Sequence, residues 1–232
     1  STPPEATWTK TRAKEDRMFK LSPNRLNYED RRCDRCFAEE LHGEKWPDGP
    51  FPGIFSKLDS QQRRYFTDRP TSDFDPSLAP GIIHNGGWVE SCPHTTGGTS
   101  FYLRGSMDAL IRFDDDTVGV VDYKSSNPKP ELADAYRPQL AAYQWALTHP
   151  ASGEAETVSA VGLMVVWPEA MVDTEQGRAN LISTTWIPVE VEDGWFEDFL
   201  GRIAPLADAP SEAPSRPDCQ WCDLRERLSD TP

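Results

Sequence analysis

The 232-residue sequence has no long hydrophobic run, and no stretch approaches the roughly 20 apolar residues that a membrane-spanning helix needs. Its first twenty residues, STPPEATWTKTRAKEDRMFK, also lack the apolar core of a secretory signal peptide. We therefore expect a protein without a signal peptide or membrane contact, located in the cytoplasm. Hydrophobic residues make up only 37% of the chain and prolines number 21, which predicts much loop around one large domain or two small ones.

The sequence also lacks the excess of positive charge that is typical of a general nucleic-acid-binding protein, since its formal net charge is -14. The charge is uneven: residues 1–70 hold 14 Lys and Arg against 12 Asp and Glu, whereas residues 71–232 hold 10 against 26. Contacts with a polyanion are therefore expected in the N-terminal third, at RLNYEDRRCDR and QQRRYF, unless these are ordinary solvated helix faces. A protein partner could also supply a basic surface.

Hydrophobic spacing divides the chain into expected elements. Residues 1–20 are predicted to be an N-terminal tail, and residues 21–232 a single domain. Helices are expected over 22–41, with Ser22 as a cap, and over 54–66, 133–149 and 194–206; strands are expected over 100–113, 117–124, 158–167 and 180–191. In the second helix, Ile54, Leu58 and Tyr65 fall on one side. Residues 68–99 read as loop with short extended pieces, and 206–217 as a Pro/Ala linker before a metal-binding segment at 218–228.

The acidic stretch at 114–116 separates two strands and predicts a hairpin turn. With the turn centred on Asp115, Asp108 and Asp122 lie seven residues away on either side and should face each other. Lys124 shares a strand face with Asp122, because the side-chain period of a strand is two. An isolated D-x-K can also be a chance pattern on a solvated strand face.

Two opposed carboxylates repel each other unless they share a hard cation such as Mg²⁺, which prefers oxygen ligands. An adjacent ammonium can stabilise charge on phosphate oxygens or orient a water. This set suits phosphodiester hydrolysis. It suits acyl transfer poorly, because no nucleophile–base pair accompanies it.

Three short motifs occur in order: G-x-x-D from Gly105 to Asp108, D-Y-K from Asp122 to Lys124, and Q-x-x-x-Y from Gln139 to Tyr143. Their order and spacing resemble the PD-(D/E)XK nuclease superfamily, most of all its RecB-type branch, which includes the CRISPR-adaptation exonuclease. The resemblance implies an α/β fold with a restriction-endonuclease-like core, a central mixed sheet flanked by helices. It also implies a nuclease dependent on Mg²⁺ or Mn²⁺ that acts on DNA, on single strands or ends. Two alternatives remain. One is a non-catalytic DNA-binding or assembly subunit with this fold, and the other is a structural module held together by zinc, in which the D-x-K pattern is incidental.

The resemblance also assigns roles to individual residues. Asp108, Asp122 and the carbonyl of Tyr123 would hold the metal, and Lys124 would be the catalytic lysine. Gln139 and Tyr143 would contact the substrate strand or orient Lys124, although Tyr143 could instead be a core aromatic. The RecB-type branch often has a further His or Glu ligand upstream. The candidates for this ligand are His84 and, more weakly, His42 and Glu40.

Two C-x-x-C motifs, CDRC at 33–36 and CQWC at 219–222, predict one four-thiolate metal site that joins the termini. Spacing alone favours zinc at Cys33, Cys36, Cys219 and Cys222. The resemblance favours a 4Fe-4S cluster, because NYEDRRCDRCF is similar to the N-terminal cluster segment of the RecB-type branch. Those relatives take three ligands from the C-terminus, so here Cys36 would supply the fourth. Disulfides are not expected in a reducing cytosol, and Cys92 stands apart as a buried or loop cysteine.

Overall fold

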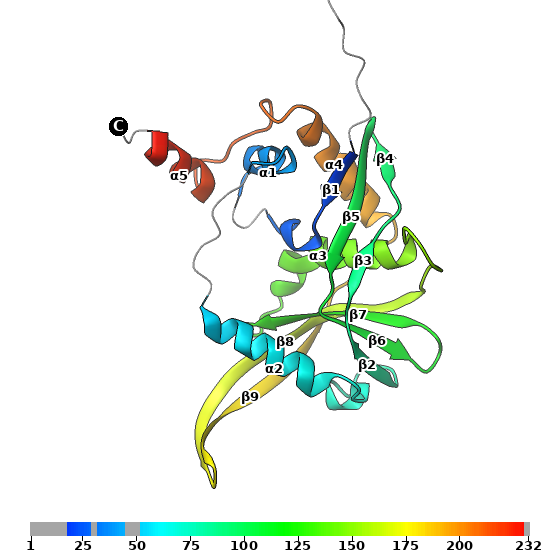
Figure 1. Ribbon diagram of the computed structural model, residues 1–232, viewed down its shortest axis with the longest axis vertical. Helices are drawn as coiled ribbons and strands as arrows, with labels where there is room; N and C mark the ends of the chain where they lie inside the picture. Colours follow the sequence, from blue (N-terminus) through cyan, green and yellow to red (C-terminus); the bar gives the residue numbers. More distant parts are fainter. Residues whose placement is uncertain (1–17, 29–31, 45–51, 230–232) are drawn as a thin grey trace, which may run out of the picture.

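The computed structural model describes residues 18–28, 32–44 and 52–229 (Figure 1). Its centre is a five-stranded mixed sheet with the strand order β2-β6-β7-β8-β9. The strands are β2 (Gly81–Asn85), β6 (Ala109–Phe113), β7 (Val118–Ser125), β8 (Val158–Thr174) and β9 (Gly177–Pro188). β7 and β8 run parallel, and the other neighbouring pairs are antiparallel. The predicted central mixed sheet is confirmed.

Helices cover both faces of this sheet. They are α2 (Gly53–Phe66) and α3 (Leu132–Thr148). Phe66 of α2 packs on the face that carries Tyr123, whereas Leu140 of α3 packs on the face that carries Val120. α3 also forms the crossover that parallel strands need. Because β7 is covered on both sides, its first six residues are buried, which explains its nearly unbroken apolar sequence.

A second, smaller sheet lies on the far side of α3 (Figure 1). It consists of β1 (Met18–Leu21), β3 (Trp88–Glu90), β4 (His94–Thr96) and β5 (Thr99–Ser106), with β5 paired to the other three. Two helices pack against it, α1 (Asp34–Leu41) and α4 (Trp195–Asp208). Phe101 of β5, Phe37 of α1 and Phe199 of α4 belong to one buried apolar cluster. This second sheet was not predicted from the sequence.

Several predicted boundaries are wrong. The tail expected over residues 1–20 ends earlier, because Met18–Leu21 forms β1; residues 1–17 lie outside the described part of the chain. The helix expected over 22–41 is a short 3-10 helix, η1 (Pro23–Arg25), followed by α1, and Ser22 makes no side-chain cap. Residues 29–31 of that prediction are outside the described residues.

The strand expected over 100–113 is divided at Met107 and Asp108 into β5 and β6, which belong to different sheets. The chain passes closely over Gly86 at this point, where a Cβ atom would meet the Met107 carbonyl oxygen at 2.1 Å. The linker expected over 206–217 begins later, because α4 continues to Asp208. The segment expected at 218–228 is mostly helix α5 (Gln220–Ser229).

On α2, the predicted apolar side does not face the sheet. Gln62 and Phe66 are buried, whereas Ile54 and Tyr65 are 61% and 57% exposed. Beyond the central sheet, β8 and β9 continue as a two-stranded arm, drawn in yellow in Figure 1. Among the described helices, none is both long enough and apolar enough to cross a membrane. The loop expected over 68–99 contains a second 3-10 helix, η2 (Thr71–Asp73), before β2, β3 and β4.

Candidate active site and metal centre

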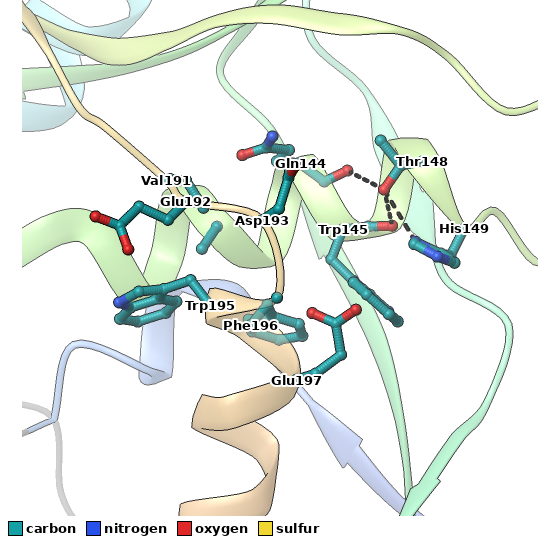
Figure 2. A pocket seen from close by; sticks show the side chains of 12 residues that line it. Gln144, Trp145, Thr148, His149, Val191, Glu192, Asp193, Trp195, Phe196 and Glu197 are labelled. Carbon is teal, nitrogen blue, oxygen red and sulfur yellow. Dashed lines mark hydrogen bonds between the residues drawn. The ribbon is translucent and has the colours of Figure 1, made fainter.

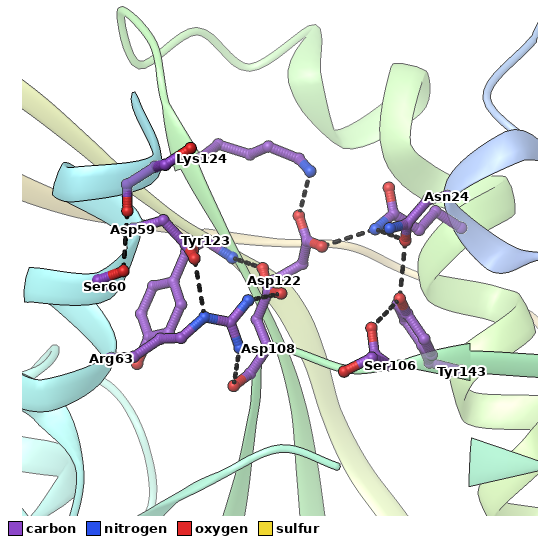
Figure 3. A network of polar contacts seen from close by, with 12 residues as sticks. Asn24, Asp59, Ser60, Arg63, Ser106, Asp108, Asp122, Tyr123, Lys124 and Tyr143 are labelled. Carbon is purple, nitrogen blue, oxygen red and sulfur yellow. Dashed lines mark hydrogen bonds and ion pairs between the residues drawn. The ribbon is translucent and has the colours of Figure 1, made fainter. Parts of the chain in front are cut away.

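The hairpin of β6 and β7 brings two carboxylates together. Ala109 pairs with Val121, so the next position outward sets Asp108 opposite Asp122, in the register that the sequence predicts. Asp108 Oδ2 accepts a hydrogen bond from the Tyr123 backbone N–H at 2.9 Å. The two carboxylates lie side by side between α2 and α3 (Figure 3).

Asp122 is almost fully buried, with only 2% of its surface exposed. Its Oδ1 accepts a hydrogen bond from Gln139 Nε2 at 2.6 Å, and its Oδ2 lies 2.5 Å from Lys124 Nζ as an ion pair. Burial raises the pKa of Asp122 to about 7; Lys124 opposes this shift, and the neighbouring Asp108 adds to it. Burial alone would lower the pKa of Lys124, but the ion pair with Asp122 outweighs it and raises that pKa.

This donor set fits a divalent metal ion. Burial removes the water that would stabilise two neighbouring negative charges. A hard cation between the two carboxylates, one of which is deeply buried, stabilises their ionised form instead. Asp108 and Asp122 are oxygen donors of the kind that Mg²⁺ and Mn²⁺ prefer. Tyr123 contributes its N–H to Asp108, while a role for its carbonyl as a metal ligand stays a prediction.

Arg63 of α2 belongs to the site in a role that was not predicted, since the sequence indicated it only as part of QQRRYF, a candidate contact for a polyanion. Its guanidinium donates to the Asp108 backbone carbonyl at 2.9 Å and pairs with Asp108 Oδ1. Its Nε donates to Asp59 Oδ2 at 3.0 Å, four residues earlier on the same helix. For its contact with Asp108, the sequence offers only the i, i+4 spacing of Asp59 and Arg63, which is common on solvated helices. Arg63 therefore fixes the Asp108 carboxylate and places a permanent positive charge beside the pair.

A second missed group comes from η1 and the residues after it. Gln139 Nε2 donates to Asn24 Oδ1 at 2.9 Å as well as to Asp122. Asn27 Nδ2 donates to Gln139 Oε1 at 2.7 Å, and Asn27 Oδ1 accepts from the Gln139 backbone N–H at 3.1 Å. That N–H follows Pro138, which interrupts the helix ladder because it has no N–H of its own. The N-terminal segment thus holds Gln139 against Asp122.

Tyr143 is a core aromatic, and its role toward the substrate or Lys124 stays a prediction. Its ring is buried in the apolar cluster under α3, and its hydroxyl lies 2.7 Å from both Asn24 Oδ1 and the Ser106 carbonyl oxygen. Burial raises the pKa of this hydroxyl, so it stays a donor. Gly105, next to Ser106, allows the close approach of η1, because a Cβ atom there would meet Pro23 Cδ at 2.7 Å.

The structure does not bring the three candidates for a further metal ligand to the carboxylate pair. His84 on β2 lies 3.6 Å from Asp68. His42 contacts the Ala207 carbonyl oxygen at 2.7 Å, and Glu40 pairs with Arg32. Among the described residues, no group of three His, Cys, Asp or Glu ligand atoms gathers at Asp108 and Asp122.

A cavity of about 360 Å³ lies elsewhere, between α3 and the start of α4 (Figure 2). Trp145 and Trp195 line it together with the acids Glu192, Asp193 and Glu197. Within the described part of the chain, no Lys or Arg lines it, and it shares no residue with the carboxylate network. Such a cavity does not suit a phosphate group.

The four cysteines of the C-x-x-C motifs converge, as the sequence predicts, although Cys36 and Cys219 are 183 positions apart. All four sulfur atoms lie within 4.8 Å of one another. Cys222 Sγ is 3.6 Å from Cys33 Sγ and 3.5 Å from Cys36 Sγ. Around one tetrahedral zinc ion with bonds of about 2.3 Å, sulfur atoms stand about 3.8 Å apart. A four-iron cluster separates its thiolates further, because each is bound to a different iron.

The chemistry of these thiols also fits a metal. Burial and neighbouring sulfurs raise the pKa of Cys36, so this thiol resists ionisation without a cation. For Cys219, burial is outweighed by backbone N–H donors, including Cys33 N–H at 3.3 Å from its sulfur, and the pKa falls to about 7. The Arg225 guanidinium pairs with Glu39 and ties α5 to α1 beside the centre. The four cysteines could therefore hold a metal that joins the two ends of the domain.

Comparison with known proteins agrees with this architecture. A search of the curated proteins gives no match. Among solved structures, the chain is similar to one described as "Crystal structure of SSO0001", with a TM-score of 0.51 and 15% identity, covering 92% of this chain and 86% of that chain. At this identity the similarity shows a shared fold alone. A family model described as the PD-(D/E)XK nuclease superfamily matches residues 13–227. With nearly the whole chain matched, this protein belongs to the PD-(D/E)XK nuclease superfamily.

Proposed function

We propose that this protein is a metal-dependent DNA nuclease that hydrolyses phosphodiester bonds on single strands or strand ends. The observation that supports the proposal best is the carboxylate pair of Asp108 and Asp122 with the Lys124 ammonium 2.5 Å from one of its oxygens. Acid, acid and lysine beside one another match the chemistry of phosphodiester cleavage, in which negative charge builds up on phosphate oxygens.

Each residue has a distinct role in this proposal. Asp108, Asp122 and the Tyr123 carbonyl would hold Mg²⁺ or Mn²⁺. When bound, such an ion would polarise a phosphate oxygen of the substrate and lower the pKa of a bound water. Lys124 is within reach of the same carboxylate and would stabilise the phosphate or orient the attacking water. Gln139 keeps Asp122 in place through its 2.6 Å hydrogen bond. Tyr143 supports that arrangement through Asn24.

The approach of DNA is supported by the local charge on α2. This helix carries Lys57, Arg63 and Arg64 against one acid, Asp59, in a chain whose net charge is -14. Phosphates would therefore meet positive charge along α2. A protein partner with a basic surface would strengthen the contact. The described cysteines form no disulfide, which supports the cytoplasmic location that we propose.

We also propose that the protein falls in the RecB-type branch and that its four-cysteine centre is structural. Two metals are candidates for the centre. The sulfur separations of 3.5, 3.6 and 3.8 Å support one zinc ion, whereas the resemblance supports a 4Fe-4S cluster. An anaerobic preparation will be colourless with one zinc per chain in the first case. In the second it will be brown, with a broad absorption band near about 400 nm.

The proposed activity is tested by incubating the purified protein with end-labelled single-stranded DNA, duplex DNA and RNA of matched sequence, in Mn²⁺ or in EDTA. We expect cleavage of single-stranded DNA that needs Mn²⁺. The Lys124→Ala variant, purified in parallel, controls for contaminating nucleases. Binding of DNA without cleavage in any metal would reject the enzyme and favour a DNA-binding subunit with a nuclease fold.

A further inference from the structure

An apolar groove of about 280 Å³ lies beside the carboxylate site, between the start of α2 and the base of the β8–β9 arm. Its lining consists of Ile54, Phe55 and Leu58 from α2, Ser125 from β7, Val166, Trp167 and Pro168 from β8, and Asn180 and Ile182 from β9. The volume is just below the roughly 300–1,000 Å³ of sites for drug-sized ligands. The groove therefore suits a small, flat, mostly apolar group.

The indole of Trp167 is the main feature of this groove. Trp167 is 38% exposed, and among the described residues it makes no ring–ring contact. A β-bulge between Pro168 and Ala170 follows it directly, and bulges re-aim neighbouring side chains. A large aromatic ring left exposed at a strand bend offers a stacking surface.

The polar residues of the groove match the edge of a nucleobase. Asn180 offers an amide and Ser125 a hydroxyl, groups that can donate to and accept from a base. Ser125 itself is held by Gln62 Nε2 at 3.3 Å, from the same helix as Arg63. A purely apolar partner surface would leave the Asn180 amide without a hydrogen bond from the partner, at a cost in affinity.

The groove is next to the proposed catalytic site through α2. Ser125 faces α2, on the opposite side of β7 from Asp122 and Lys124. Gln62, which donates to Ser125, is followed on α2 by Arg63, which pairs with Asp108. Ser125 follows Lys124 directly and is three residues beyond Asp122 on β7. At about 3.3 Å per residue, the groove begins about 10 Å from the Asp122 backbone, which corresponds to about three stacked nucleotides. Of the positive residues of α2, Arg63 is thus placed at the carboxylate site.

From these observations we propose that the groove is a base-binding subsite, which rests on the proposed nuclease function. An unpaired base of the substrate, one to three nucleotides from the scissile phosphate, stacks on Trp167 and presents its edge to Asn180 and Ser125. A base in a duplex cannot enter without leaving its stack, which costs a few kcal/mol. The subsite therefore gives the enzyme a preference for single strands.

The experiment measures binding of a labelled single-stranded oligonucleotide in Mg²⁺, with the cleavage-deficient Lys124→Ala protein as background. When Trp167→Ala is combined with Lys124→Ala, binding of the oligonucleotide should weaken about tenfold, because one stacked base is lost. Met171→Ala is the matched control, because Met171 is 68% exposed on the same arm and outside the groove. It should leave the affinity unchanged.

A scan with abasic nucleotides tests the same contact without changing the groove. Removal of one base, one to three positions from the scissile bond, should weaken binding about tenfold. The same removal should have no further effect in the Trp167→Ala protein, because the base and the indole form one interaction. Equal sensitivity at every position, or additive losses, would overturn the subsite.

Other outcomes are also decisive. If Trp167→Ala changes the oligomeric state while DNA affinity stays the same, the groove contacts protein and the inference is wrong. If the wild-type protein cleaves DNA, but neither Trp167→Ala nor the abasic scan changes DNA affinity, the subsite is wrong and the proposed function stands. If the wild-type protein neither binds nor cleaves nucleic acid, the proposed function fails and the subsite with it.

Discussion

Binding of Mg²⁺ should weaken steeply when the pH falls from 8 to 5.5. Burial raises the pKa of Asp122 to about 7 in the metal-free protein, so this carboxyl carries a proton at the lower pH. A metal ion must then displace the proton, because only the ionised carboxylate is a good ligand. Because its pKa is raised, Asp122 becomes protonated as the pH falls below about 7, whereas an ordinary Asp stays ionised down to about pH 4. Metal binding should therefore weaken toward lower pH.

The size of the effect follows from the same value. At pH 5.5, about 1.5 units below a pKa of about 7, about 3% of Asp122 is ionised, against about 90% at pH 8. The apparent Kd for Mg²⁺ should therefore be about 30-fold higher at pH 5.5, which corresponds to about 2 kcal/mol. An Asp with an ordinary pKa near 3.9 would show almost no change over this range.

Isothermal titration calorimetry at the two pH values measures the difference directly. Buffers of different ionisation enthalpy will also report proton release, which should be near one per metal ion at pH 5.5 and near zero at pH 8. Asp122→Asn should lose measurable Mg²⁺ binding at both values. An unchanged Kd in the wild-type protein would show that Asp122 is already ionised, and would refute the reasoning from burial.

Three further outcomes test other parts of the structure. Lys124→Ala should abolish cleavage while folding and metal binding stay nearly intact, and wild-type turnover in a gel assay would remove this residue from the mechanism. Cys219→Ser should lower the Tm by about 10 °C or more and speed amide exchange in both α1 and α5, because a structural thiolate centre contributes several kcal/mol to the free energy of folding. Cys92→Ser is the control, and equal Tm values in the two variants would contradict a structural centre. Arg63→Ala should lower kcat by about 10- to 100-fold through disorder of the Asp108 carboxylate. Arg112→Ala removes a comparable ion pair, to Glu156, and should leave kcat unchanged; equal losses in both variants would indicate a general effect.

The hairpin could be predicted because its determinants are local. Asp116 has a positive φ of 65° in the turn, and the apolar residues of β6 and β7 face helices on both sides. Counting outward from such a turn gives the pairing of Asp108 with Asp122. The four-cysteine cluster was also predictable, since two C-x-x-C motifs have few other uses.

The supporting residues could not be predicted, because their partners are remote in sequence. Arg63 is 45 positions from Asp108, and Asn24 is 115 from Gln139. The basic stretch QQRRYF contains Arg63, but no pattern in the sequence links Arg63 to Asp108 or Asn24 to Gln139. The division of residues 100–113 into two strands likewise depends on packing over Gly86, and nothing within the segment signals it. Tertiary contacts thus determine the parts of the site that local patterns do not.

The route of the N-terminal segment has a consequence for how the protein folds during its synthesis. Asn24 and Asn27 hold Gln139 against Asp122, and the chain a few residues later reaches Cys33, whose partners Cys219 and Cys222 are the last ligands to be synthesised. On the ribosome, a chain that already contains Asp108, Asp122 and Lys124 still lacks half of the thiolate set. We expect such an unfinished chain to leave η1 unanchored and the Asp108 and Asp122 carboxylates without support, so that the proposed cleavage activity would arise only after the C-terminal cysteines have been made.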